Sequence, residues 1–181
     1  WFPLGMGYGS FKPFVNLVKR PDLNAISHSG PCPTDGWCAN AGAGMIWDQN
    51  CGQIDNPWAA GTYAYWCNQT GVKLISYKFP ITSNTKEMNL SLFCRLDGVM
   101  RIQLLDSVPA VVQTIDIQYG DGRVQIPINT ISGSATDFRL TFELLSGSYM
   151  AFGCPQFVNQ GTESAIEIYP YLGSSEAIYP E

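Results

Sequence analysis

Aromatic and polar side chains are interleaved between residues 45 and 70, and this segment contains most of the side chains suited to binding a ligand. A sugar ring has an apolar face of C–H groups and a rim of hydroxyls, so a flat aromatic side chain beside amides and carboxylates suits it. Amide and carboxylate groups hydrogen-bond hydroxyls in fixed planes. We therefore predict a glycan-binding site formed by Trp47, Asp48, Asn50, Asp55, Trp58, Tyr63 and Trp66. Tryptophan in a β-sandwich is often part of the core, so some of these rings are expected to be buried instead.

Catalytic groups are scarce. The single histidine, His28, lies in a turn-like Ser-His-Ser-Gly tetrapeptide, and no Gly-x-Ser-x-Gly motif exposes a nucleophile. Glycoside hydrolysis requires two carboxylates at a set separation. Asp48 with Asp55 is the best pair, followed by Asp116 with Asp121, but nothing in the sequence brings either pair together. We expect a protein that is not an enzyme; a polysaccharide hydrolase or lyase using Asp48 or Asp55 is the alternative.

Metal and cysteine chemistry are also limited. The chain has six cysteines without a Cys-x-x-Cys pair, and with one histidine it does not suit a structural zinc site. We expect no cofactor; a Ca²⁺ ion held by loop oxygens between Asp48 and Asp55 is the alternative, without a spaced ligand motif. Cys94 lies on the apolar side of an alternating segment and is predicted to be a buried, reduced thiol. A local disulfide between Cys32 and Cys38 is expected.

Composition excludes several classes of protein. The 181 residues are 45% hydrophobic and only 14% charged, which excludes intrinsic disorder. The formal net charge is -5 and no run of Lys or Arg occurs, so we expect no nucleic-acid partner. No apolar segment reaches the roughly 18 residues that span a bilayer, so we expect no membrane insertion. The chain starts Trp-Phe-Pro rather than with Met, which favours a fragment or a processed product.

Period-two alternation of apolar and polar residues predicts strands in the second half of the chain. The alternating segments cover residues 88–96, 115–119, 124–128 and 138–144. Turn signals follow or separate them at Asp97-Gly98, Gly120-Asp121-Gly122, Ser132-Gly133-Ser134 and Ser146-Gly147-Ser148, and Asp121-Gly122 is the strongest hairpin signal. No segment shows a helical stripe. The pattern predicts an all-β fold of about eight strands, arranged as an antiparallel two-sheet β-sandwich.

Two regions complete the predicted organisation. Residues 1–13 are rich in Gly and aromatic residues and are expected to form an extended N-terminal arm, while residues 14–181 form the β-sandwich binding domain. Residues 21–70 are dense in turn formers and predict long structured loops with a few short strands.

A second candidate surface is a weakly charged sheet face that suits either saccharides or a subunit interface; it carries Arg101, Gln103, Asp116, Gln118, Arg123 and Gln125.

The order of short motifs resembles a carbohydrate-binding-module-like jelly roll, found at the C-terminal end of bacteriophage tail fibres and tailspikes and in some secreted glycosidases. The likeness covers roughly residues 14–172. The matching motifs are Asn16-Leu-Val-Lys-Arg-Pro-Asp22, Thr34-Asp-Gly-Trp37, Ile75-Ser-Tyr-Lys-Phe79, Leu90-Ser-Leu-Phe93, Asp137-Phe-Arg-Leu-Thr-Phe142, Gly153-Cys-Pro-Gln-Phe157 and Gln160-Gly161. The chain departs from the family in lacking Phe after Asp22, in lacking the Glu of the final motif, and in its Cys- and Trp-rich segment 39–60.

The resemblance implies a non-catalytic attachment domain that holds a cell-surface saccharide, located at the virion surface at the tip of a fibre or spike, or otherwise extracellular. It also implies a homotrimer, in which the arm continues from a fibre shaft and Trp37 packs in the core rather than touching the ligand. Three weak sites tied together gain avidity. The remaining alternative is a purely structural module for trimerisation or decoration.

Overall fold

The computed structural model describes residues 16–29, 36–40, 45–81, 88–128 and 137–159. The predicted arm and the turn at residues 132–134 lie outside them. Within these ranges no helix is long and apolar enough to cross a membrane. The strands are β1 (Ile26–Ser27), β2 (Trp37–Asn40), β3 (Cys51–Asp55), β4 (Tyr63–Cys67), β5 (Lys73–Ser76), β6 (Phe79–Pro80), β7 (Met88–Leu105), β8 (Val111–Ile128) and β9 (Asp137–Asn159).

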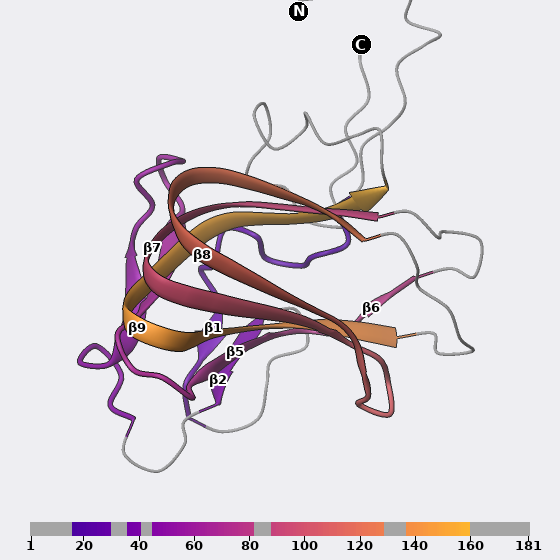
Figure 1. The fold of residues 1–181 in the computed structure, drawn as a ribbon, viewed down its shortest axis with the longest axis horizontal. Helices are drawn as coiled ribbons and strands as arrows, with labels where there is room; N and C mark the ends of the chain where they lie inside the picture. The colour runs from indigo at the N-terminus through magenta and orange to yellow at the C-terminus, as the bar shows by residue number, and fades with distance from the viewer. Residues whose placement is uncertain (1–15, 30–35, 41–44, 82–87, 129–136, 160–181) are drawn as a thin grey trace, which may run out of the picture.

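Three long antiparallel strands, β7, β8 and β9, double back together and form both layers of a sandwich (Figure 1). Phe142 and Phe152 show the fold most directly. They are ten residues apart on β9, yet their rings stack with centroids 4.2 Å apart. The core therefore lies between the two halves of the same strands, and the predicted all-β sandwich is confirmed.

The short strands extend each layer from β9. In the first layer β5 pairs with the first half of β9, and β2 and β1 continue from it. In the second layer β4 pairs with the second half of β9, at Tyr65 opposite Phe152, and β3 follows as the outer strand. The β1–β2 pair is parallel, whereas every other strand pair among the described residues is antiparallel.

The predicted hairpin at Asp121-Gly122 is wrong, as are the turns at Asp97-Gly98 and around Gly147. All three sites lie inside continuous strands, at the bend where the layers separate. Gly98, Gly122 and Gly147 adopt φ values of 139°, 123° and 99°, which favour glycine. Since glycine permits both a reverse turn and a sharp bend, the sequence signal does not separate them. The connection between β7 and β8 is instead a loop in which Asp106 accepts backbone hydrogen bonds from Val108 and Ala110.

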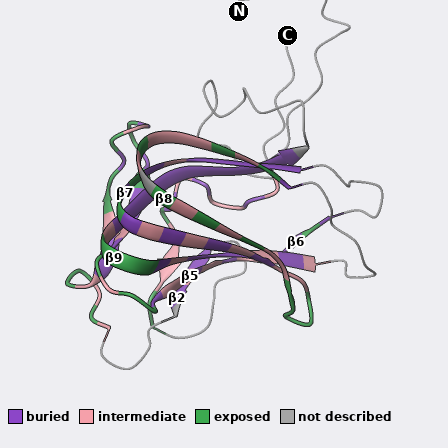
Figure 2. Ribbon diagram, viewed as in Figure 1, coloured by how far each residue is buried: buried purple, intermediate pink, exposed green. Residues whose placement is uncertain are grey.

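The alternation predicted for the inner faces is confirmed. The apolar positions of β7 and β9, including Met88, Leu90, Cys94, Leu140 and Phe142, are fully or almost fully buried (Figure 2). Trp37 has no exposed surface and contacts both Phe142 and Phe152 between the layers, which agrees with its expected packing role. Its indole N–H donates to the carbonyl oxygen of Arg20.

The first described residue, Asn16, fastens the start of this region to the end of β9. Its buried side chain donates to the carbonyl oxygen of Pro155 and accepts from the backbone N–H groups of Val18 and Phe157. The backbone N–H of Leu17 also donates to the Phe157 carbonyl oxygen. One amide side chain thus satisfies three backbone groups that would otherwise be buried without partners.

Candidate functional site

The β3–β4 hairpin turns Trp66 outward, on the side of the second layer away from the core. Trp66 lies opposite Gly52 on β3 and Ala151 on β9, and Ala151 lies opposite Arg95 on β7, which in turn lies opposite Asp121 on β8. Side chains at paired positions project from the same face of a sheet. This row therefore places an indole, a small residue and an ion pair side by side on one outer face.

Trp66 and Asp48 converge over Gly52. A side chain at position 52 would place its Cβ 2.9 Å from the Asp48 carboxylate oxygen and 3.1 Å from the Trp66 indole nitrogen. Asp48 reaches this position because it occupies a tight turn with φ of 65°, where its backbone N–H donates to the Cys51 carbonyl oxygen. Because Gly52 has no side chain, the Trp66 indole N–H and the Asp48 carboxylate can both lie above it.

Trp58 lies on the same outer face, above β7. Its ring stacks on Phe93 with centroids 6.0 Å apart and an interplanar angle of 16°. Asn56 holds the loop in place, because its side-chain oxygen accepts from the Trp58 backbone N–H and its amide donates to the Thr62 hydroxyl. The Asn56 amide itself sits over Gly153, where a Cβ would come within 2.7 Å of it.

Polar groups border the aromatic rings. The Arg95 guanidinium lies 3.3 Å from the Asp121 carboxylate, and both side chains are more than half exposed. Burial raises the pKa of Tyr149, and the nearby charge of Arg95 partly opposes this rise. We call this set, together with Asp48, the aromatic strip; it consists of Asp48, Trp66, Trp58, Phe93, Arg95, Asp121 and Tyr149. From the strand spacing, the Cα atoms of Trp66 and Phe93 are roughly 12 Å apart, which is wider than one sugar ring.

Trp47 and Asn50, also predicted site residues, have other neighbours. Trp47 stacks on His28, with ring centroids 4.5 Å apart and planes 7° from parallel. The Asn50 side-chain oxygen accepts from the backbone N–H of Ile46 and stabilises the turn before β3. The turn-like tetrapeptide around His28 leaves this residue exposed, and its contact with Trp47 is not predictable from a local pattern.

Asp55 and Tyr63 are paired across the β3–β4 hairpin and line a separate pocket of about 450 Å³. Asn56, Ala60, Gly61 and Thr62 complete its lining. The seven predicted residues thus divide among three places: Trp66, Asp48 and Trp58 on the outer face, Asp55 and Tyr63 at the pocket, and Trp47 and Asn50 near the turn before β3. The structure does not gather them into one cluster.

Phe93, Arg95 and Tyr149 contribute to the aromatic strip but were not predicted as site residues. A signal for two of them was present, because Phe93 and Arg95 occupy the outward positions of an alternating strand. An aromatic side chain at an outward position, between polar neighbours, indicates a surface that binds a ligand or a partner. Tyr149 follows the segment Ser146-Gly147-Ser148, whose pattern predicts a turn, so the face on which Tyr149 lies was not predictable.

Neither predicted carboxylate pair is assembled. Asp48 lies beside the outward position of Gly52, whereas Asp55 is three residues further along and on the opposite face of β3. Asp116 accepts two hydrogen bonds from Arg101, at 2.8 and 2.9 Å, and this contact lowers the pKa of Asp116. Asp121 pairs with Arg95. The structure shows no acid–base pair at either place.

The second predicted surface is divided by the bend. Arg101 and Asp116, with Gln103 and Gln118, lie on the outer face of the first layer, where Arg101 pairs with Asp116 and Val99 with Gln118. Arg123 and Gln125 lie opposite Phe93 and Ser91 on the second layer. The six residues do not form one face, because β8 turns through the bend between positions 118 and 123.

Cysteine and metal predictions have separate outcomes. Cys94 is fully buried and free, as predicted, and burial raises its pKa to about 11. Cys38 is disulfide-bonded, whereas Cys32 lies outside the described residues. Among the residues that the structure describes, no three His, Cys, Asp or Glu side chains gather to hold a metal ion. Calcium binding between Asp48 and Asp55 stays a prediction.

Comparison with known proteins identifies the fold only. No protein-family model matches the chain, and no curated protein matches its sequence. The structure is similar to the enzymatically active domain of tailspike protein 4 from bacteriophage CBA120, with a TM-score of 0.55, 11% identity, and coverage of 79% of this chain. This chain spans 21% of that domain's length. At this identity the likeness shows a shared architecture and not a shared activity.

Two further structures are more distant. One contains the CBM22-1 and GH10 modules of Clostridium thermocellum xylanase 10B with xylohexaose, at a TM-score of 0.48 and 15% identity, covering 82% of this chain and 28% of that one. The other is TmCBM61 in complex with β-1,4-galactotriose, at a TM-score of 0.47 and 8% identity, covering 70% of this chain and 90% of that one. Both values are too low to support an argument about function.

Proposed function

We propose that this domain is a non-catalytic glycan-binding domain whose ligand lies on the aromatic strip. The observation that carries the proposal is the pair of partly exposed indoles, Trp66 and Trp58, on one outer sheet face beside the exposed Arg95–Asp121 ion pair. Both rings are held on one side by packing, Trp66 above Gly52 and Trp58 above Phe93. Their remaining surfaces face outward and are positioned before any ligand arrives.

The chemistry of the strip matches a saccharide better than a charged or fully apolar ligand. An indole face packs against the C–H groups of a sugar ring. The Asp48 and Asp121 carboxylates accept hydrogen bonds from hydroxyls, and the Arg95 guanidinium donates to them. These groups are two carboxylates and one guanidinium, so a strongly anionic partner gains no net attraction. The roughly 12 Å between the Cα atoms of Trp66 and Phe93, on which Trp58 stacks, suits an oligosaccharide that extends across β4, β9 and β7.

The biological setting is proposed from the motif order. The resemblance to the tail-fibre modules supports an attachment domain of a phage fibre or spike, located at the virion surface and binding cell-surface glycans. The same resemblance supports a homotrimer, in which three strips act together. Weak binding at one strip would then become useful attachment through avidity.

The test is quantitative glycan binding by the full chain, with single tryptophan variants. Trp66→Ala and Trp58→Ala are each expected to weaken binding at least tenfold, equivalent to about 1.4 kcal/mol. Trp47→Ala is the matched control, because it removes an indole that stacks on His28 outside the strip. Loss of binding in Trp47→Ala alone would place the ligand elsewhere and refute the strip.

Two other outcomes separate the competing functions. Release of reducing ends from a host polysaccharide, abolished by Asp48→Asn, would show an enzyme. An assembled, folded protein that binds no glycan on an array would support the structural module. Circular dichroism of each variant establishes that the sandwich is intact before either comparison is made.

A further inference from the structure

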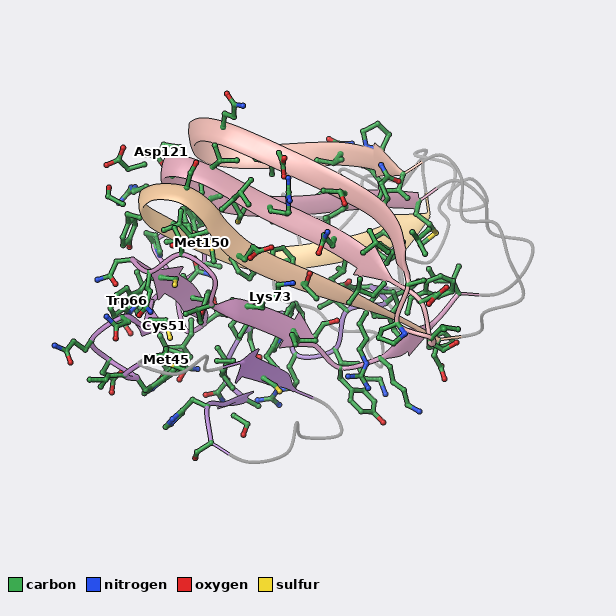
Figure 3. All side chains as sticks on the ribbon, turned by 60° about the horizontal axis from the view of Figure 1, so that its bottom comes forward. Met45, Cys51, Trp66, Lys73, Asp121 and Met150 are labelled. Carbon is green, nitrogen blue, oxygen red and sulfur yellow. The ribbon has the colours of Figure 1, made fainter. Side chains whose placement is uncertain are left out.

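Two free cysteines face each other across the β3–β4 hairpin. Cys51 begins β3, Cys67 ends β4, and the two are direct partners in the antiparallel register. Neither has any exposed surface, and neither is bonded in the structure. Figure 3 shows Cys51 at the end of the molecule where Met45 and Trp66 also lie.

The backbone hydrogen bonds define the type of this pair. The Asn68 N–H donates to the Asn50 carbonyl oxygen at 2.9 Å, so the neighbouring pair, residues 50 and 68, is hydrogen-bonded. Antiparallel pairs alternate, which makes Cys51 and Cys67 a non-hydrogen-bonded pair. Consistently, the Cys51 carbonyl oxygen accepts from Asp48 on the side away from β4.

Non-hydrogen-bonded pairs bring side chains closest together. Their Cα atoms are about 4.5 Å apart, which is within the range of about 4.4–6.8 Å that a disulfide requires. Both side chains also point to the same face of the hairpin. A bond between the two sulfur atoms therefore requires side-chain rotation and no rearrangement of the strands.

The surroundings place the two sulfurs in one small, sulfur-rich space. The Tyr65 side chain, on the same face of β4 as Cys67, lies close enough to influence the pKa of both thiols. The Cys51 sulfur also lies 3.3 Å from the Met45 sulfur, and the Cys67 thiol donates to the Gln69 carbonyl oxygen. Both cysteines therefore border the Tyr65 side chain on the buried face of the hairpin.

We propose that Cys51 and Cys67 form a cross-strand disulfide when the chain folds in the presence of a low-molecular-weight disulfide such as glutathione disulfide. One thiolate attacks the small disulfide and releases one thiol, and the second thiolate then attacks the mixed disulfide and releases another. Two protein thiols are oxidised to one protein disulfide, and one small disulfide is reduced to two thiols, which take up the two protons.

The bond is expected to form during folding rather than afterwards. Burial raises the pKa of both thiols, and the nearby Tyr65 side chain and, for Cys67, the hydrogen bond to the Gln69 backbone only partly offset this effect. The thiolate is the reactive form, so the folded pair exchanges slowly. In the nascent hairpin the same sulfurs are already in register and still accessible to the small disulfide.

The bond would also hold part of the aromatic strip, a consequence that rests on the proposed function. Cys67 follows Trp66 directly, and Cys51 accepts the backbone bond that fixes Asp48. A covalent link between them would limit the motion of the indole and the carboxylate relative to each other. Binding that needs both groups then loses less conformational entropy.

The decisive measurement is disulfide mapping of the full wild-type chain. The protein is refolded with a glutathione redox buffer, free thiols are alkylated, and the chain is digested with chymotrypsin. Cleavage after Trp47, Trp58, Trp66 and Leu74 places Cys51 in residues 48–58 and Cys67 in residues 67–74. A linked pair of these peptides is expected, and it should disappear on reduction. Alkylation of both residues, or linkage of either one to another cysteine, would overturn the proposal.

Thermal unfolding provides the matched control. Closing a loop of this length is expected to raise the wild-type Tm by about 6–12 °C on oxidation. Cys67→Ala retains Cys38 and its bond, so the oxidation-dependent rise should be smaller in this variant by that amount. Glycan binding is measured separately. A mapped disulfide without glycan binding rejects the proposed function alone, whereas binding by a chain with two alkylated thiols rejects the disulfide alone.

Discussion

Replacing Gly98 by alanine tests the bend that creates both layers. Gly98 lies on β7 where the strand passes β9, with φ of 139°. A Cβ at this position would be 2.1 Å from the Ser146 carbonyl oxygen and 2.8 Å from the Gly147 Cα. Both contacts are with backbone atoms, so no side-chain rotation can relieve them. The strands must move apart for alanine to fit.

The expected loss has two parts. Holding a residue other than glycine in this backbone conformation costs about 1–3 kcal/mol. Forcing a methyl group into a closely packed site costs about 1–3 kcal/mol more. We therefore expect Gly98→Ala to lower the free energy of unfolding by about 2–6 kcal/mol. That is a large share of the stability of a domain of this size.

Gly122→Ala is the matched control at the same bend. Gly122 has φ of 123°, but a Cβ there would meet no atom within 4 Å. This variant should lose only the backbone part, about 1–3 kcal/mol. Urea unfolding followed by circular dichroism gives both values, provided that the m-value is unchanged. Equal losses in the two variants, or a loss below about 1 kcal/mol for Gly98→Ala, would refute the close approach of β7 and β9.

Three further predictions concern the side chains that hold the layers. Asn16→Ala should lower the free energy of unfolding, measured by urea titration, by about 2–4 kcal/mol, because it leaves buried backbone groups of Pro155 and Phe157 without partners. A variant as stable as the wild type would contradict this role. Hydrogen bonding to Arg101 lowers the pKa of Asp116 below its ordinary value of 3.8, so the stability from this pair is present above that pH and is lost as the pH falls through the lower folded pKa. A carboxyl titration by NMR should find the Asp116 midpoint below 3.8, moving back toward that value in Arg101→Gln, and an unchanged midpoint would show that the pair does not form in solution. Burial raises the pKa of Cys94 to about 11, so at pH 8 an aromatic disulfide reagent should label it only as fast as the chain opens, and labelling at the rate of the unfolded chain would show that the site is exposed.

The inner faces of the sandwich were predictable from sequence because they depend on a short-range rule. Side chains alternate across a strand, so Leu90, Cys94, Leu140 and Phe142 could be assigned to the core without knowing what they pack against. The role of Trp37 was likewise expected from the motif resemblance. The core assignments on β7 and β9 require only the local period of the chain.

The bend was not predictable because glycine permits both a hairpin turn and a sharp bend within a continuous strand. At Gly98, Gly122 and Gly147 the sequence shows a glycine between alternating segments, which is also the pattern of a hairpin. Only pairing with the neighbouring strands decides that the backbone continues through each glycine. The predicted polar face was divided for the same reason, since Arg101 and Arg123 lie on different sides of the bend.

The sequence alone determined which side chains are aromatic, polar or apolar. The alternation of apolar and polar residues along β7 and β9 determined which of these side chains point inward. The tertiary structure alone decided which outward groups meet. Trp66, Arg95 and Asp121 come from β4, β7 and β8 and become neighbours only through the registers of β9 with β4 and of β7 with β9 and β8. Trp47, close to Trp66 in sequence, stacks on His28 instead. Strand pairing joins residues that are far apart along the chain, and that information is absent from any local pattern.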